Sequence, residues 1–74
     1  MIQEAIAKVN SGQSEVILDF SSVCRIDTNM AGALEELARL AGGTSAKVVL
    51  RAVNTDIYRV LKQLKLTQRF TFVT

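Results

Sequence analysis

Apolar and polar residues follow two different periods along this chain, and the periods divide it into six segments. Residues 2–9 carry apolar side chains at positions 2, 5, 6 and 9, which is the spacing of one face of a short helix. Asn10–Gly12 supplies turn residues. Val16–Phe20 then forms a nearly continuous apolar run, which predicts a strand buried on both faces of a parallel sheet.

The second half of the chain repeats this alternation. From Thr28 the apolar positions are 30, 34, 37, 38 and 41, which predicts a helix, and Gly42–Gly43 predicts its left-handed C-terminal cap. Lys47–Leu50 predicts a second strand. Asn54–Asp56 predicts the N-cap of a third helix with apolar positions at 57, 60, 61 and 64. Residues 70–73 predict a closing strand.

The predicted order of elements is therefore αβαβαβ. Strands that alternate with helices indicate an α/β fold with a small, mainly parallel sheet, right-handed crossovers and flanking helices. With 74 residues the chain is expected to form one domain, residues 1–74, with a thin core. An unpaired apolar strand at an edge of so small a sheet would favour association with a partner.

Composition narrows the function. Hydrophobic residues make up 49% and charged residues 22%, which is the balance of a folded soluble domain. The net charge is only +2, the basic residues are scattered, and aromatic residues are rare, so direct binding of nucleic acid is not expected. No apolar stretch is long enough to cross a membrane.

Two residue counts exclude much chemistry. The chain has no histidine and one cysteine, Cys24, so zinc sites of cysteine and histidine and nucleophile arrangements that require histidine are ruled out. No disulfide can form within the chain, which fits a reducing, cytoplasmic compartment. Cys24 itself, among apolar neighbours, is expected to pack as a small hydrophobic residue.

Function in a parallel sheet gathers beyond the carboxyl ends of the strands. Two junctions lie there, residues 23–30 and residues 51–56. In the first, Asp27 or Thr28 is placed to cap the following helix, and this ordinary structural role is one interpretation. The other is a phosphorylation switch at Thr28, because a helix N-terminus accommodates an added charge of about −1.5 to −2. Gly32, inside that helix, indicates either a close approach to the sheet or simple tolerance of glycine.

These residues resemble the STAS domain, the family of anti-sigma factor antagonists, stressosome subunits and cytosolic tails of sulfate transporters. The resemblance is carried by segments that span most of the chain: Val16–Val23, Arg25–Thr28, Gly32–Leu34, Ala46–Leu50 and Asn54–Leu66. It implies a non-enzymatic module that needs no metal or cofactor. Such a module binds an anti-sigma factor of the serine/threonine-kinase type and is released when that kinase phosphorylates it.

The resemblance also implies roles for individual residues. Thr28 takes the place of the phosphoacceptor, and Asp27 that of the preceding aspartate, which shapes the loop. The docking surface is expected to include four further residues: Arg25, Asn29, Met30 and Asn54.

The chain departs from the family pattern in two places. Met30 stands where the family has glycine, which alters the surface that a kinase would meet. Members usually begin with a pair of strands, and none is predicted ahead of Ile2. The expectation is either a truncated form or another cover for that sheet edge, such as a homodimer through the exposed strand.

A second branch of the family is also similar to this chain, namely the STAS subunit of bacterial phospholipid-transport ABC systems. The shared residues are the run Arg25–Thr28, the pair Val53–Asn54 and Tyr58. This likeness implies a regulatory subunit that docks on the transporter ATPase through the junction containing Thr28.

Single features of the sequence also match two other kinds of site. Asp19, Asp27 and Asp56 all fall near strand ends, and oxygen clusters of this kind bind magnesium in other α/β domains. Asp27 also bears a faint likeness to the phosphoacceptor of small phosphatase domains. However, there is no second acidic pair and no suitably placed lysine, so an enzyme is not expected.

Overall fold

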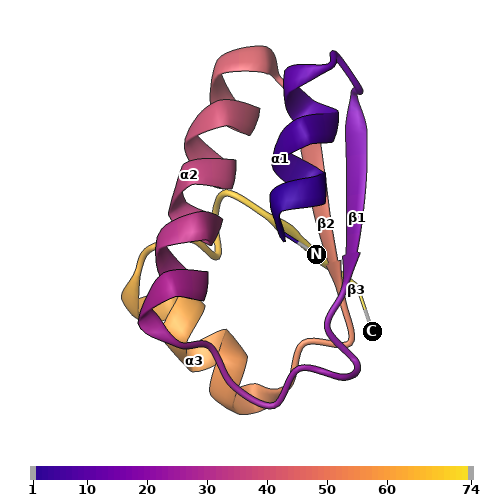
Figure 1. Ribbon diagram of the computed structural model, residues 1–74. Helices are drawn as coiled ribbons and strands as arrows, with labels where there is room; N and C mark the ends of the chain where they lie inside the picture. Colours follow the sequence, from indigo (N-terminus) through magenta and orange to yellow (C-terminus); the bar gives the residue numbers. More distant parts are fainter. Residues whose placement is uncertain (1, 74) are drawn as a thin grey trace.

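The structure is a computed structural model that describes residues 2–73, and it contains the six elements in the expected order (Figure 1). These elements are α1 (Ile2–Asn10), β1 (Glu15–Asp19), α2 (Thr28–Thr44), β2 (Lys47–Arg51), α3 (Thr55–Gln63) and β3 (Thr71–Val73). The predicted α/β class, with a small parallel sheet and flanking helices, is confirmed. The closing strand starts at Thr71, one residue later than predicted.

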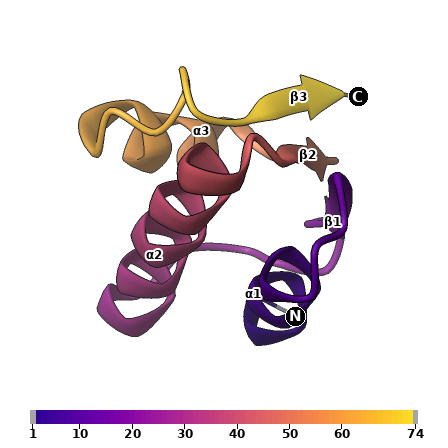
Figure 2. The same cartoon turned by 90° about the horizontal axis from the view of Figure 1, so that it is seen from above.

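The sheet has the strand order β1-β2-β3, and both pairs are parallel. Its register places Ile17 beside Val49 and Val49 beside Thr71. Helices α1 and α2 lie side by side against one face of the sheet (Figure 2). All three strands end at the same edge, where α2 and α3 begin (Figure 1).

Helices α1 and α2 lie on one face of the sheet, and β1 is buried on that face only, so the prediction of a first strand buried on both faces was wrong. Along β1, Val16 and Leu18 are buried whereas the side chain of Ile17 is 55% exposed. The apolar run of β1 therefore contains an alternating strand, because Ile17 lies on the open face. Glu15 and Lys47 pair on that same face, with 3.9 Å between Oε2 and Nζ.

The core lies between this covered face and the helices. Its fully buried side chains come from every helix and from all parts of the chain: Val9, Phe20, Leu34, Leu37, Val48, Leu50, Ile57 and Leu61. Within residues 2–73, no buried side-chain nitrogen or oxygen lacks a hydrogen-bond partner.

The end of α2 differs from the prediction. The helix continues through Gly42 and Gly43 to Thr44, and Ser45 rather than a glycine adopts the left-handed conformation, with φ of 60°. The Ser45 N–H bonds to the carbonyl of Ala41, and so does that of Ala46 at 3.0 Å. The glycine pair therefore does not serve as the stop.

Candidate functional site

Two loops lie side by side where the strands end (Figure 1). Residues 20–27 connect β1 to α2, and residues 52–54 connect β2 to α3. The side-chain amide of Asn54 joins them by donating to the carbonyl of Cys24 at 3.2 Å and to that of Val23 at 3.4 Å. We call this surface, made of residues 20–30 and 52–54, the switch edge.

The first loop has an inner and an outer side. Phe20 is buried and Val23 and Ile26 are half-buried, so every third residue anchors the loop to the core. Arg25 is consequently exposed. Cys24 is exposed too, so the prediction that it packs as a core residue was wrong; the apolar anchors lie on either side of it.

Asp27 is the residue that caps α2. Its Oδ1 accepts a hydrogen bond from the Met30 N–H at 2.7 Å, and its carbonyl accepts from the Ala31 N–H at 2.9 Å. Thr28 is the first residue of the helix and is exposed, and its hydroxyl makes no hydrogen bond to residues 2–73. The two roles left open by the sequence are therefore separated: Asp27 holds the helix end, and the Thr28 hydroxyl is accessible.

The other expected docking residues differ in their exposure and in the hydrogen bonds that they make. Asn29 is exposed beside Thr28, and Met30 is half-buried. Asn54 is exposed as a residue, but both ends of its amide are used, because its Oδ1 also caps α3 by accepting from the Ile57 N–H at 2.8 Å. The predicted N-cap of the third helix is confirmed at Asn54. Its role in this structure is to hold the two loops of the switch edge together.

Gly32 lies one turn beyond Thr28 and is exposed. A Cβ added there would meet nothing within 4 Å. Close approach of the helix to the sheet is therefore not the reason for this glycine.

The structure also shows an apolar cavity that the sequence did not indicate. It has a volume of about 380 Å³ and is lined by Ala52, Val53, Tyr58, Phe72 and Val73. The Tyr58 and Phe72 rings meet edge to face with 5.3 Å between centroids, and Tyr58 is 44% exposed. The sequence predicted the closing strand at residues 70–73, but it did not predict that this strand lies against the third helix at Tyr58.

Asp19 lies at the end of β1, close to the switch edge. The pKa of Asp19 is lowered because its carboxylate accepts a hydrogen bond from the Ser21 N–H, at 2.9 Å, with further contributions from the Ser21 side chain and Arg51. In the part of the chain that the structure describes, no three acidic or cysteine side chains gather as metal ligands would. The considered cluster of Asp19, Asp27 and Asp56 is not formed.

The chain is thus a small α/β domain with a parallel three-stranded sheet, and its two capped helices, α2 and α3, begin at the edge where the strands end. The family profile of the STAS domain matches residues 1–74, so the chain belongs to the STAS domain family. STAS domains are regulatory or protein-interaction modules and are generally non-catalytic. Searches of curated proteins and of solved structures gave no match.

The helices offer no candidate for a membrane crossing. None within residues 2–73 combines the length and the apolarity that a span requires.

Proposed function

We propose that this chain is a phosphorylation-controlled binding module, which docks a partner on its switch edge and releases it when Thr28 is phosphorylated. The observation that carries the proposal is the division of labour at the start of α2. Asp27 caps the helix, and Thr28 exposes a free hydroxyl at the first helical position. A phosphate on Thr28 would change the surface without removing a bond that holds the fold.

The electrostatics of this position support a switch. A helix N-terminus stabilises an added anion, so the modified chain stays folded. The Asp27 carboxylate lies directly before Thr28, and the two negative charges would together oppose an acidic or apolar partner surface. The expected partner is an anti-sigma factor of the serine/threonine-kinase type.

The experiment measures the binding of that kinase to the purified wild-type chain and to four variants, one of which is a control. Thr28→Glu should stay cooperatively folded and bind more weakly, by tenfold or more. Thr28→Ala should bind like the wild type but no longer be released by ATP. Arg25→Glu should weaken docking without affecting phosphorylation of the free chain.

Thr55 provides a matched control, because it is the exposed first residue of α3 and follows its own cap, Asn54. Thr55→Glu should release the partner much less than Thr28→Glu. Equal release would mean that the effect is one of general charge at this edge. Phosphate found on another residue after kinase treatment would remove Thr28 as the acceptor.

A second candidate function is that of a regulatory subunit docked on the ATPase of a lipid-transport ABC complex. The observation that favours it is the exposure of Tyr58, a residue that this branch shares and that is not absorbed by the core. Here Thr28 would be a direct contact and would not need to be phosphorylated. Tyr58→Ala should then weaken binding to the ATPase as strongly as Thr28→Glu, whereas it should leave kinase binding nearly unchanged.

A further inference from the structure

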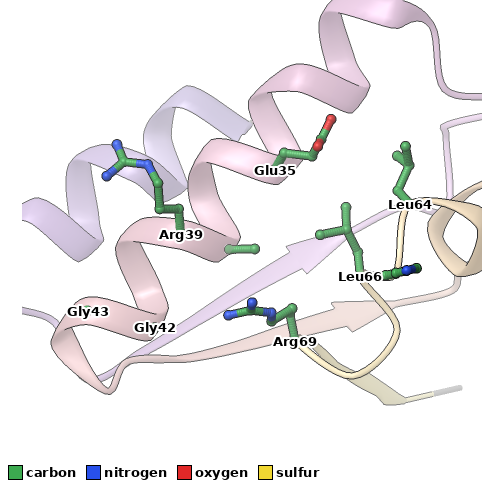
Figure 3. A pocket seen from close by; sticks show the side chains of 9 residues that line it. Glu35, Arg39, Gly42, Gly43, Leu64, Leu66 and Arg69 are labelled. Atoms are coloured by element: carbon green, nitrogen blue, oxygen red, sulfur yellow. The ribbon is translucent and has the colours of Figure 1, made fainter.

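A groove of about 500 Å³ runs along the later half of α2, opposite the segment that follows α3 (Figure 3). It is distinct from the switch edge. Its lining residues are Glu35, Ala38, Arg39, Gly42, Gly43, Leu64, Lys65, Leu66 and Arg69. Ala38 and Leu66 are buried and form an apolar floor, while the charged side chains stand at the rim.

Neither the packing nor the backbone conformation of residues 2–73 requires glycine at positions 42 and 43 in the groove wall. Neither Gly42 nor Gly43 has a positive φ. A Cβ on Gly43 would meet nothing, and one on Gly42 would make only an ordinary 3.6 Å contact with Nη1 of Arg69. Because glycine weakens a helix relative to alanine, the pair is unfavourable for folding. Its effect on the surface is to leave this wall of the groove without side chains.

At Lys65 the situation is reversed, because a residue with a long side chain stands where glycine would be favoured. It follows α3 in the left-handed conformation, with φ of 60°. Its N–H bonds to the carbonyl of Lys62 at 3.1 Å, and the Leu66 N–H bonds to that of Leu61 at 2.9 Å, which is the Schellman pattern. Glycine is the favoured residue at this position. The chain instead places a lysine there, and its side chain lines the groove.

The charge of the groove is positive. Arg39, Lys65 and Arg69 line it, against one acidic lining residue, Glu35. Arg39 pairs with Glu36, whereas Lys65 and Arg69 form no ion pair within residues 2–73, so these two cations are available to a ligand. In Figure 3 the Arg69 side chain extends across the groove towards Gly42.

We propose that this groove binds an acidic segment of a partner protein, held in extended form along α2. The wall from Glu35 to Gly43 is about 12 Å long at 1.5 Å per helical residue, which is the span of about four extended residues. The floor accepts one apolar side chain, the low glycine wall lets the partner's backbone come close, and Lys65 and Arg69 meet its carboxylates. An acidic peptide fits these features better than a small anion, which would leave the apolar floor unused.

The test is an NMR titration of the whole ¹⁵N-labelled chain with a hexapeptide that alternates glutamate and leucine. Saturable shifts are expected at the amides of Gly42, Gly43, Lys65 and Arg69. Lys65→Gly should raise the melting temperature and also weaken the peptide about three- to fivefold, the effect of one rim charge. Gly43→Ala should likewise stabilise the fold and weaken binding. Stability and binding thus change in opposite directions, which separates lost binding from lost folding.

Lys62→Gln is the matched control, because Lys62 is exposed on α3 but does not line the groove; it should leave the peptide affinity unchanged. Three results would overturn the proposal. The first is that the chemical shift changes lie outside the groove, and the second is that a hexapeptide of alternating lysine and leucine binds equally well. The third is that pyrophosphate, at the same concentration as the acidic peptide, displaces it completely. The last would show that the groove senses only small anions. Thr28→Glu should bind the peptide like the wild type, so the outcome is independent of the switch proposed for Thr28.

Discussion

The side-chain amide of Asn54 donates a hydrogen bond to the backbone carbonyl of Cys24, 30 residues earlier in the chain, at 3.2 Å. The same side chain caps α3 through its oxygen, at 2.8 Å from the Ile57 nitrogen. One residue therefore couples the start of the third helix to the loop that presents Arg25 and Thr28. A displacement of α3 would be transmitted to the switch edge through this amide.

Asn54 variants should separate its two roles. Asn54→Ala removes both and should lower the free energy of unfolding by about 1–2 kcal/mol, the range for a lost cap. Asn54→Asp keeps the capping oxygen, because aspartate caps as well as asparagine, but it loses the amide donor. It should therefore cost less stability, while amide exchange of residues 21–26 speeds up as much as in Asn54→Ala. Chemical denaturation and hydrogen exchange measure the two effects.

If Asn54→Asp leaves exchange in that loop unchanged, the hydrogen bonds to Val23 and Cys24 do not hold the two loops together. The matched variant is Asp27→Asn, which retains a cap at α2 and alters no bond between the loops.

Gly32→Ala is expected to stabilise the isolated chain by up to about 1 kcal/mol, because alanine favours the helix and its Cβ has open space around it. If α2 docks a partner closely at this point, the same change should weaken binding. Thermal unfolding measures the change in stability of Gly32→Ala relative to the wild type, and a binding assay measures the change in affinity for the partner. Increased stability with unchanged affinity would show that position 32 lies outside the interface.

The element order and the positions of the N-caps of α2 and α3 could be predicted to within two or three residues, because each depends on local sequence; the sequence left open whether Asp27 or Thr28 caps α2, and the structure assigns the cap to Asp27. Asn54 and Asp27 act on backbone groups three residues ahead. The predictions were wrong where the outcome depends on contacts between parts of the chain that are distant in sequence. The apolar run at β1 reads as doubly buried, yet β1 is buried only on the face where α1 and α2 lie, which leaves Ile17 outside. Likewise α2 continues through the glycines that were predicted to stop it, ends at Thr44 and is capped by Ser45, after which the chain enters β2.

The pairing of Asn54 with Cys24 and the groove beside Gly42 also required the folded structure. Both bring together residues about 25–30 positions apart, and no short motif marks either of them.

We also propose that two copies of the chain associate through the edge of β1, which is an outer strand of the sheet. An antiparallel, two-fold pairing of two β1 strands centred on Ile17 would place Glu15 opposite Asp19 of the other copy, and these like charges repel. Such a dimer should therefore be weak at low salt and strengthen as salt screens the charges. Sedimentation velocity over a concentration series at two salt concentrations measures this.

Ile17→Lys should abolish that association without unfolding the chain, because the side chain is already 55% exposed. Thr71→Lys is the control, since Thr71 lies on the same face but on the far strand. A monomer at every concentration, or a dimer indifferent to Ile17→Lys, would contradict pairing at this edge.

Asp19 should contribute to the acid limit of stability. Its pKa is lower in the folded chain than its ordinary value of 3.8, chiefly because the Ser21 N–H donates to the carboxylate. A lowered folded pKa means that the contribution is fully present above the unfolded pKa and is lost as the pH falls below about 4 through the folded value.

Asp19→Asn keeps an oxygen for the Ser21 N–H but cannot titrate, so its melting temperature should fall less steeply between pH 5 and pH 2 than that of the wild type. Identical slopes for Asp19→Asn and the wild type would show that the turn at Ser21 does not depend on this charge.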